Sequence, residues 1–283
     1  MSEHSGYVTK AELGQGSDGQ VICAYTLKPK RYEFSKNEKK IPKIIIIGGQ
    51  HGFEKSNVFG LYYLINDLLN NWHESDILDY LRHHVEFVVI PIVNPWGFDN
   101  KSYFNANGVN VNRNYDANFT VVEDTTSNDY GGQAAFDQPE AAHVRDLVLN
   151  NLDAVYFIDS HSCGSGAVTT FGQVNWMSFG VHDDDFYTGL IQSAEYHLSN
   201  ITAHFEVDYN LELTDSDMCG HITRGTKAGT SKDWVLLQGM AASTVEGFNG
   251  FPGGARCTAE VKKANSEILG NWIMTAINTM RNA

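Results

Sequence analysis

The sequence lacks most of the features that would place it in a specialised class of protein. Its four cysteines lie far apart and form no C-x-x-C pair, which favours reduced thiols over a zinc ribbon or a disulfide framework. Lys and Arg number 20 against 34 Asp and Glu and nowhere cluster, which argues against nucleic acid as a partner. No apolar run approaches membrane-spanning length, so we expect no membrane partner either.

Boundaries within the chain are also missing. No run of Pro, Gly or Ser, no block of like charge and no internal repeat divides the 283 residues. We therefore expect a single domain over residues 1–283, with residues 1–40 as a peripheral N-terminal segment. The first residues, MSEHSGYVTK, lack a basic region followed by an apolar one, which predicts a cytoplasmic protein or one released without a classical signal. Nothing in the sequence indicates an obligate protein partner.

What is present is organised around residues 44–69, IIIIGGQHGFEKSNVFGLYYLINDLL. The apolar run predicts a buried strand that breaks at Gly48 and Gly49, and the apolar residues from Val58 onward recur at helical spacing. Between strand and helix, His51 and Glu54 have the spacing H-x-x-E. We expect both side chains to project from the same side of one helical turn, where they could bind a single metal ion.

A third metal ligand is expected at His161. It follows the apolar run 155–158 in DAVYFIDSHSCG, so both candidate segments come after the carboxyl end of a predicted strand. Open α/β sheets place their ligand sites at that edge. Two imidazoles and one carboxylate form the ligand set of catalytic zinc, with a fourth position left for water, so we predict one Zn²⁺ per chain.

Further elements follow from periodicity and turn signals. The expected strands and helices are a strand at 21–27, a short helix around 77–81, a strand within VEFVVIPIVNP, a helix from Pro139, a helix at about 183–200, a short strand at 240–245 and a helix at about 258–280. The region 211–239 is expected to be irregular. Glu246 closes the strand that begins at 240, and a carboxylate there could act as a general base beside a metal-bound water.

The segment 94–119, NPWGFDNKSYFNANGVNVNRNYDANF, is rich in Asn and Gly and is predicted to be a long loop. Arg113 lies in it between Asn112 and Asn114. Such a guanidinium is suited to bidentate binding of a carboxylate. The alternative, an arginine that ties the loop to itself, stays open.

Six motifs in order resemble the zinc carboxypeptidases of the carboxypeptidase A type: GGQHGFE, IPIVNPWGF, NANGVNVNRNY, GGQAAFDQPE, FIDSHS and GTSKDW…QG…STVEGF. The resemblance covers residues 44 to 248 approximately. It implies an α/β fold with a central mixed, twisted β-sheet and helices on both faces. It also implies zinc held by His51, Glu54 and His161, in agreement with the residue patterns.

The resemblance further implies the activity of a zinc-dependent metallocarboxypeptidase, which hydrolyses the C-terminal peptide bond of a peptide. Asn112 and Arg113 would hold the terminal carboxylate of the substrate, and Glu246 would be the catalytic carboxylate. The expected partner is therefore a peptide or small amide with a free carboxylate.

At three positions that matter for catalysis or specificity, this chain carries a residue that differs from the usual one in the resembling enzymes or is distinctive among them. Tyr103 stands where the family has an arginine that stabilises the developing oxyanion, and Arg224, in the segment before Asp233-Trp234, is the candidate for replacing it. The residue before that Asp-Trp pair lines the specificity pocket in the resembling enzymes, and here it is Lys232. A lysine there predicts a preference for carboxyl-terminal Glu or Asp.

Two other functions remain open from the sequence. One is a zinc amidohydrolase of the aspartoacylase and succinylglutamate desuccinylase type, because GGQHGFE also resembles their GGTHGNE segment; the long NANGVNVNRN loop favours the peptidase. The other is a zinc-binding pseudoenzyme or recognition module, suggested by Tyr103. Glu246 argues against it, because a protein that only binds needs no general base.

Overall fold

The structure is a computed structural model. It describes residues 6–29, 41–162, 227–247 and 258–282, together with the backbone of 177–180 and 222–224. The helix expected at about 183–200 lies outside the described residues, as do three of the four cysteines, Cys163, Cys219 and Cys257.

One mixed sheet organises the fold. Among the described residues it has eight strands in the order β1-β2-β4-β3-β5-β8-β6-β7. Their bounds are β1 Val8–Gln15, β2 Val21–Leu27, β3 Lys43–Gly48, β4 Glu86–Ile90, β5 Tyr156–Ser162, β6 Met177–Gly180, β7 Ile222–Arg224 and β8 Ala241–Gly247. The central strands β4, β3, β5 and β8 are parallel, whereas β2 joins β4 and β6 joins β8 in antiparallel pairing. This confirms the predicted α/β architecture with a mixed sheet.

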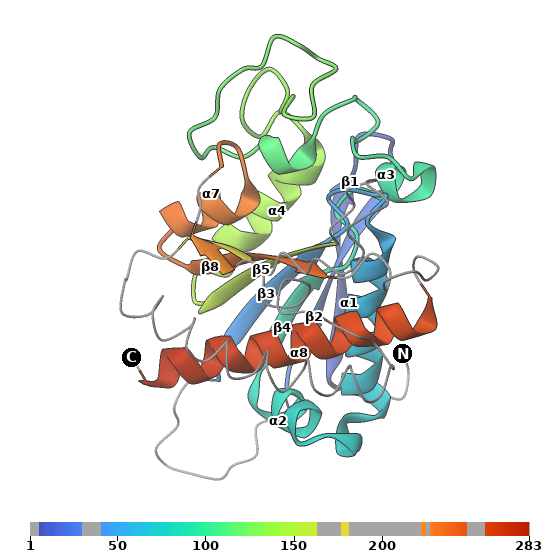
Figure 1. Cartoon of the computed structure of the whole chain (residues 1–283), viewed down its shortest axis with the longest axis vertical. Helices are drawn as coiled ribbons and strands as arrows, with labels where there is room; N and C mark the ends of the chain where they lie inside the picture. The colour runs from blue at the N-terminus through green and yellow to red at the C-terminus, as the bar shows by residue number, and fades with distance from the viewer. Residues whose placement is uncertain are drawn as a thin grey trace.

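Helices cover both faces of the sheet, as Figure 1 shows. The helices α1 (Lys55–Asn70), α2 (Asp76–His84) and α8 (Ala259–Asn282) pack on one face, and α4 (Pro139–Leu149) and α7 (Ser231–Leu237) pack on the other. In β3, Ile44 and Ile46 join the core under α1 and α8, while Ile45 and Ile47 join the core under α4 and α7. Alternate side chains of a strand point to opposite faces, so a strand covered on both sides needs the uninterrupted run of isoleucines.

The longest described helix, α8, has 24 residues and carries Glu, Lys and Asn along its length. In the part of the chain that the structure describes, no helix is long and apolar enough to cross a bilayer.

Several local expectations were wrong. Residues before 40 hold two strands rather than one, because β1 pairs antiparallel with β2 and extends the sheet at its edge. All eight of its residues lie exposed or half-buried without regular alternation, since an edge strand needs no core-facing pattern. The long loop 94–119 contains α3 (Pro95–Asn100) and a 3-10 turn, Val111–Arg113. The region expected to be irregular, 211–239, contains β7 and α7.

Candidate metal centre and active site

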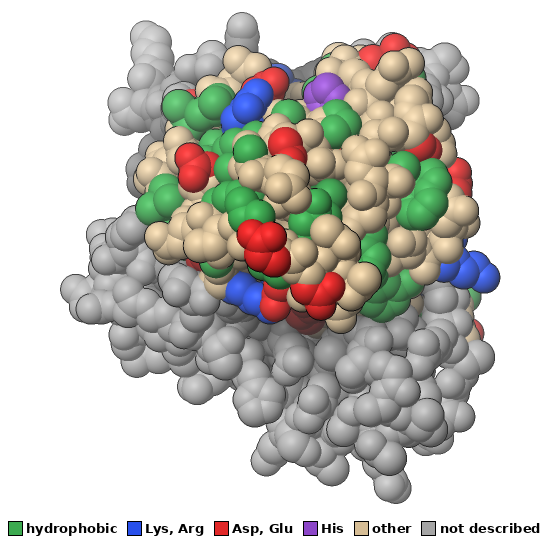
Figure 2. Space-filling view, turned by 90° about the horizontal axis from the view of Figure 1, so that it is seen from above, with side chains coloured by type: hydrophobic (Ala, Val, Ile, Leu, Met, Phe, Trp, Pro, Cys, Tyr) green, Lys and Arg blue, Asp and Glu red, His purple; other side chains and the backbone are tan. Residues whose placement is uncertain are grey.

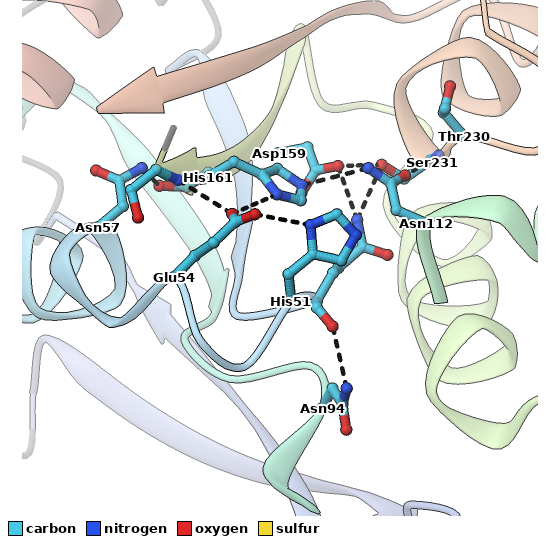
Figure 3. A network of polar contacts seen from close by, with 12 residues as sticks. His51, Glu54, Asn57, Asn94, Asn112, Asp159, His161, Thr230 and Ser231 are labelled. Carbon is cyan, nitrogen blue, oxygen red and sulfur yellow. Dashed lines mark hydrogen bonds and ion pairs between the residues drawn. The ribbon is translucent and has the colours of Figure 1, made fainter. Parts of the chain in front are cut away.

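The three predicted metal ligands meet at the carboxyl edge of two neighbouring strands (Figure 3). His51 lies in the turn after β3, Glu54 directly precedes α1, and His161 lies near the end of β5. Each offers a candidate ligand atom, and these atoms all lie within 4.8 Å of one another. All three residues are buried. Parallel strands that end at the same edge bring together side chains that are 107 residues apart in the chain.

The way in which His51 and Glu54 converge differs from the expectation. Helix α1 begins only at Lys55, so the H-x-x-E segment forms a turn rather than a turn of helix. The Glu54 N–H donates to the His51 carbonyl oxygen at 3.2 Å, which closes that turn. The two residues of the spacing do converge, but a turn rather than a helix aims both side chains at one point.

Glu54 is the centre of the cluster. Its Oε1 lies 2.9 Å from His51 Nδ1, its Oε2 lies 2.8 Å from His161 Nδ1, and the Ser162 N–H donates to Oε2 at 3.1 Å. Burial acts to raise the pKa of Glu54, but His161 and then His51 outweigh it and lower the pKa to about 2. The carboxylate is therefore ionised and held by both candidate histidines.

Asn110 fixes which nitrogen of His51 faces the cluster. The Asn110 side-chain amide donates to the Asn128 carbonyl oxygen at 2.7 Å, and its Oδ1 accepts from the Asn112 N–H at 2.9 Å. A carbonyl only accepts and an N–H only donates, so the amide orientation is determined. The same Oδ1 lies 3.1 Å from His51 Nε2, which must then carry a hydrogen. Nδ1 is then the ring nitrogen that faces Glu54 and that a metal ion would take as its ligand.

Asp159 plays the corresponding part for His161. Its Oδ1 lies 2.9 Å from His161 Nε2, and its Oδ2 accepts from Gln50 Nε2 at 2.7 Å and Ser231 Oγ at 2.6 Å. Burial would lower the pKa of His161, but Asp159 and then Glu54 outweigh it and raise the pKa well above its ordinary value. Both ring nitrogens of His161 therefore face carboxylates, and Nδ1 is the one aimed into the cluster.

This arrangement fits a divalent metal. His51 Nδ1 and His161 Nδ1 lie 2.9 Å and 2.8 Å from the two oxygens of the ionised Glu54 carboxylate, so a cation placed among them would be shared by all three residues. The donor set of two imidazoles and one carboxylate is the one that zinc takes in catalytic sites, and each histidine has a hydrogen-bonding or ionic partner behind it. The residues present thus fit a zinc ion held by His51, Glu54 and His161.

Glu246 lies beside this cluster without belonging to it. It is on β8, where it pairs with His161 of β5 in the parallel register. Among the described residues, the group that could hold a metal contains His51, Glu54 and His161 alone. Burial, followed by the negative charge of Glu54, raises the pKa of Glu246 to about 8. A carboxyl with that pKa can take up and release a proton near neutral pH.

Tyr103 lies at the site, in contact with a ligand. Its ring stacks on His51 with centroids 4.0 Å apart, and its hydroxyl accepts a hydrogen bond from Asn110 Nδ2 at 3.3 Å. Burial raises its pKa, so the phenol stays protonated at neutral pH and keeps its own hydrogen to donate.

Asn112 lies on the opposite side of His161 from Glu54, and Arg113 follows it in the chain. Asn112 Nδ2 is 3.3 Å from His161 Nε2, and its Oδ1 accepts from the Ser231 N–H at 3.0 Å. Arg113 donates from Nε to Asp129 Oδ1 at 2.8 Å and from Nη1 to the Asn112 carbonyl oxygen at 2.6 Å. The acid that pairs with Arg113 thus lies 16 residues further along the chain. Arg113 does tie its loop together, but with only part of its guanidinium.

The last two predicted site residues differ in what the structure says of them. Lys232 is buried in α7, its Nζ lies 3.2 Å from Asp233 Oδ1, and burial lowers its pKa. Arg224 ends β7, where it pairs with Phe179 of β6. It lies in a strand rather than in the irregular segment expected, and its side chain is not among those described, so its proposed role stays a prediction.

Sequence reasoning missed four supporting residues: Gln50, Asn110, Asp159 and Ser231. Asp159 carried a usable signal, because residues two apart on a strand share a face and it is two before His161. No such signal marks the others, which reach the site from the turn after β3, the loop before the 3-10 turn and the start of α7.

Comparison with known proteins agrees with this geometry. Residues 1–250 match the zinc carboxypeptidase family. The chain belongs to that family. Members of the family bind zinc and act on peptide substrates.

Two curated relatives are both named inactive metallocarboxypeptidase ECM14. The one from Arthroderma gypseum is 23% identical over 195 residues, which cover 61% of this chain and 33% of the relative. The one from Schizosaccharomyces pombe is 25% identical over 170 residues, covering 53% of this chain and 34% of the relative. The chain thus spans about a third of the length of these relatives.

Solved structures share the fold. Carboxypeptidase A from Helicoverpa armigera has a TM-score of 0.72 at 16% identity, with 100% of this chain and 70% of that chain covered. Thrombin activatable fibrinolysis inhibitor has a TM-score of 0.74 at 16% identity, with 100% and 71% covered. Murein-tripeptide amidase MpaA from Escherichia coli O157 has a TM-score of 0.51 at 16% identity, with 95% and 91% covered.

Proposed function

We propose that this protein is a zinc-dependent metallocarboxypeptidase that removes the last residue of peptides. The observation that carries the proposal is the pairing of a two-histidine, one-carboxylate cluster with Glu246 on the adjacent strand. A site that only stores metal needs the first three residues and not the fourth. Glu246 has a pKa raised to about 8, which suits a group that accepts a proton and passes it on.

The proposed chemistry assigns each residue one task. When bound by His51, Glu54 and His161, zinc supplies a Lewis acid that polarises the scissile carbonyl and lowers the pKa of water. Glu246 accepts the proton of the attacking water and donates it to the leaving amine. Tyr103 keeps a hydroxyl hydrogen beside His51 and could donate it to the developing oxyanion.

The proposed substrate clamp is Arg113 with Asn112. A guanidinium that holds the terminal carboxylate places the last peptide bond beside the metal cluster, so only one residue is released. The position of Asn112 next to His161 supports this, because it links the clamp to the catalytic end.

The activity test uses a zinc-loaded sample and peptides that differ only at the carboxyl terminus. We expect release of the last residue from a free acid, no release from the corresponding terminal amide, and loss of activity in excess chelator. Glu246→Gln should keep zinc and the fold but lower kcat by about 100-fold to 10,000-fold, the usual contribution of a general base. Near-parental kcat in Glu246→Gln would exclude the proposed role.

The oxyanion donor can be identified in the same assay. Tyr103→Phe removes only the hydroxyl and should lower kcat by about 100-fold if that group stabilises the transition state. Arg224→Gln tests the alternative donor predicted from the sequence. A kcat unchanged in either variant removes that residue from the mechanism.

We further propose that Lys232 gives a preference for carboxyl-terminal Glu or Asp. Its ammonium is buried beside Asp233, and a substrate carboxylate would gain an ion pair there that an apolar or cationic side chain cannot make. The test compares release of terminal Glu, Leu and Lys. Glu should be released fastest by the parent, and Lys232→Ile should reverse the order of Glu and Leu; equal rates for all three would refute the assignment.

A second candidate is a metal-binding protein without peptidase activity. The relatives named inactive metallocarboxypeptidase favour it. It predicts that zinc binds tightly and that neither free acids nor amides are cleaved, with Glu246→Gln indistinguishable from the parent in every assay.

A further inference from the structure

The cluster around Arg113 contains a carboxylate that the proposed mechanism does not use. Asp129 Oδ1 accepts from Arg113 Nε at 2.8 Å and lies 3.1 Å from Lys227 Nζ. The hydrogen bond from Arg113, which outweighs burial, lowers the pKa of Asp129. Two cations and one anion therefore meet where the proposed substrate carboxylate would bind.

The surrounding backbone holds this cluster in place. The Asn110 N–H donates to the Tyr130 carbonyl oxygen at 2.9 Å, next to Asp129 in the chain. The Tyr115 N–H donates to the Gly229 carbonyl oxygen at 3.0 Å, and the Gly229 N–H donates to the Ala117 carbonyl oxygen at 2.8 Å. Two loops, one on each side of Arg113, are thus bonded to its own segment.

Glycines allow those loops to approach so closely. A Cβ at Gly131 or at Gly229 would collide with the Arg113 carbonyl oxygen, and Gly229 also has a φ of +74°. Both positions accept only glycine without a shift of the backbone. The close approach places Asp129 and Lys227 beside the same guanidinium.

The hydrogen bonds of Arg113 divide its guanidinium into a used and an unused part. Nε is taken by Asp129, and one Nη1 hydrogen is taken by the Asn112 carbonyl oxygen. Within the described residues, no contact is made by Nη2. A carboxylate can meet a guanidinium along the Nε–Nη2 edge or along the Nη1–Nη2 edge, and Asp129 occupies the first. The second edge is the one left for a ligand.

We propose that Asp129 is a positioning residue that fixes the guanidinium of Arg113 so that its Nη1–Nη2 edge meets the terminal carboxylate of the substrate. Lys227 supplies the charge that Asp129 would otherwise cancel, because one anion shared by two cations leaves the cluster positive. This inference rests on the proposed role of Arg113 and names the residues that orient it.

Figure 2, which views this end of the molecule, shows basic side chains on the described residues as separate spots among acidic and uncharged ones. Attraction of a carboxylate therefore depends on local contacts rather than on a broad positive surface.

The experiment measures binding, so it does not depend on turnover. The zinc-loaded Glu246→Gln variant is titrated calorimetrically with acetyl-Ala-Ala-Glu, once as the free acid and once as the terminal amide. We expect Kd for the free acid to be at least about 10-fold lower than for the amide, as a charge-assisted hydrogen-bond pair implies. Adding Asp129→Ala should raise Kd for the free acid by about 10-fold and leave Kd for the amide unchanged.

The matched variant is Asp129→Asn, which keeps the Oδ1 acceptor for Nε but loses the charge. It should restore Kd for the free acid to within about 3-fold of the Glu246→Gln background, because orientation is retained. Adding Lys227→Gln should raise the same Kd by a few-fold at low salt and less at high salt, because its side chain is 57% exposed.

Each other result overturns a different statement. If acid and amide bind equally in the background variant, the proposed role of Arg113 is wrong. If they differ and Asp129→Ala changes neither, the positioning role alone is wrong. If the free acid binds more tightly in both Asp129 variants than in the background variant, Asp129 competes with the substrate carboxylate. If Kd rises equally for the acid and the amide and Tm falls, the role of Asp129 is merely structural.

Discussion

The metal end and the carboxylate end of the site are built differently. His51, Glu54 and His161 are buried and come from the ends of central strands or the turn after one. Arg113, Asp129 and Lys227 come from loops or a short 3-10 turn, and the side chains of Asp129 and Lys227 are 53% and 57% exposed. The candidate metal ligands are thus fixed by the same packing that forms the core, whereas the proposed recognition groups are fixed by loop contacts. Specificity can change in such a molecule without disturbing the catalytic geometry.

The largest effect that should separate the two ends is loss of a metal ligand. His161→Ala should lower zinc affinity by more than about 100-fold, the upper range for loss of a supporting residue, because only three protein ligands hold the ion. Arg113→Ala is the control and should keep parental affinity. Competition with a chromophoric chelator measures both. Full zinc occupancy in His161→Ala would show that the ion binds elsewhere.

Next in size is loss of the residue that orients His51. Asn110→Ala should lower zinc affinity by about 10-fold to 100-fold, since His51 Nδ1 would no longer be held toward Glu54. Asn110→Asp keeps an acceptor for Nε2 and should bind zinc more tightly than the alanine variant. The same competition assay applies, and parental affinity in Asn110→Ala would contradict the tautomer argument.

A smaller effect is expected at the loop that borders Arg113. Gly229→Ala adds a Cβ that collides with the Arg113 carbonyl oxygen and strains a positive φ. Gly239→Ala has the same strain, with φ +83°, but nothing within 4 Å, so it is the matched control. The control should lose about 1 kcal/mol of unfolding free energy and Gly229→Ala clearly more, as urea titration would measure. Zinc affinity should be unchanged in both variants. If both lost the same unfolding free energy, the loop would be able to shift and make room for the Cβ without further cost.

The last predicted effect is a pH dependence at Glu246. The pKa near 8 in the folded protein exceeds the ordinary carboxyl value of 4.5, so the folded state binds the proton more tightly than the unfolded state. The resulting stabilisation is full below about pH 4.5 and is lost as pH rises through 8. In chelator, the Tm of Glu246→Gln relative to the parent should therefore be higher at pH 9 than at pH 5. A difference independent of pH would place Glu246 in a more solvated position.

Much of the fold could be predicted from the sequence, because the strongest local patterns belong to elements that are buried. The isoleucine run of β3 and the helical spacing of Val58, Leu61 and Leu64 were identified correctly, since each is buried in the core. Strand β1 and helix α3 were missed. Their local patterns are weak, because an edge strand and a six-residue helix are stabilised mainly by what they pack against.

For the site, the sequence by itself determined the chemical types that can meet. Histidine and glutamate after predicted strands indicated the metal set, and order along the chain indicated the family, because strand ends are encoded locally and parallel strands share an edge. Only the tertiary structure decided how these groups are aimed. The amide of Asn110 behind His51 and the pairing of Asp129 with Arg113 join residues that are 59 and 16 positions apart in the chain. Their directions depend on donors and acceptors that loops bring together on folding, and no local pattern in the chain records that arrangement.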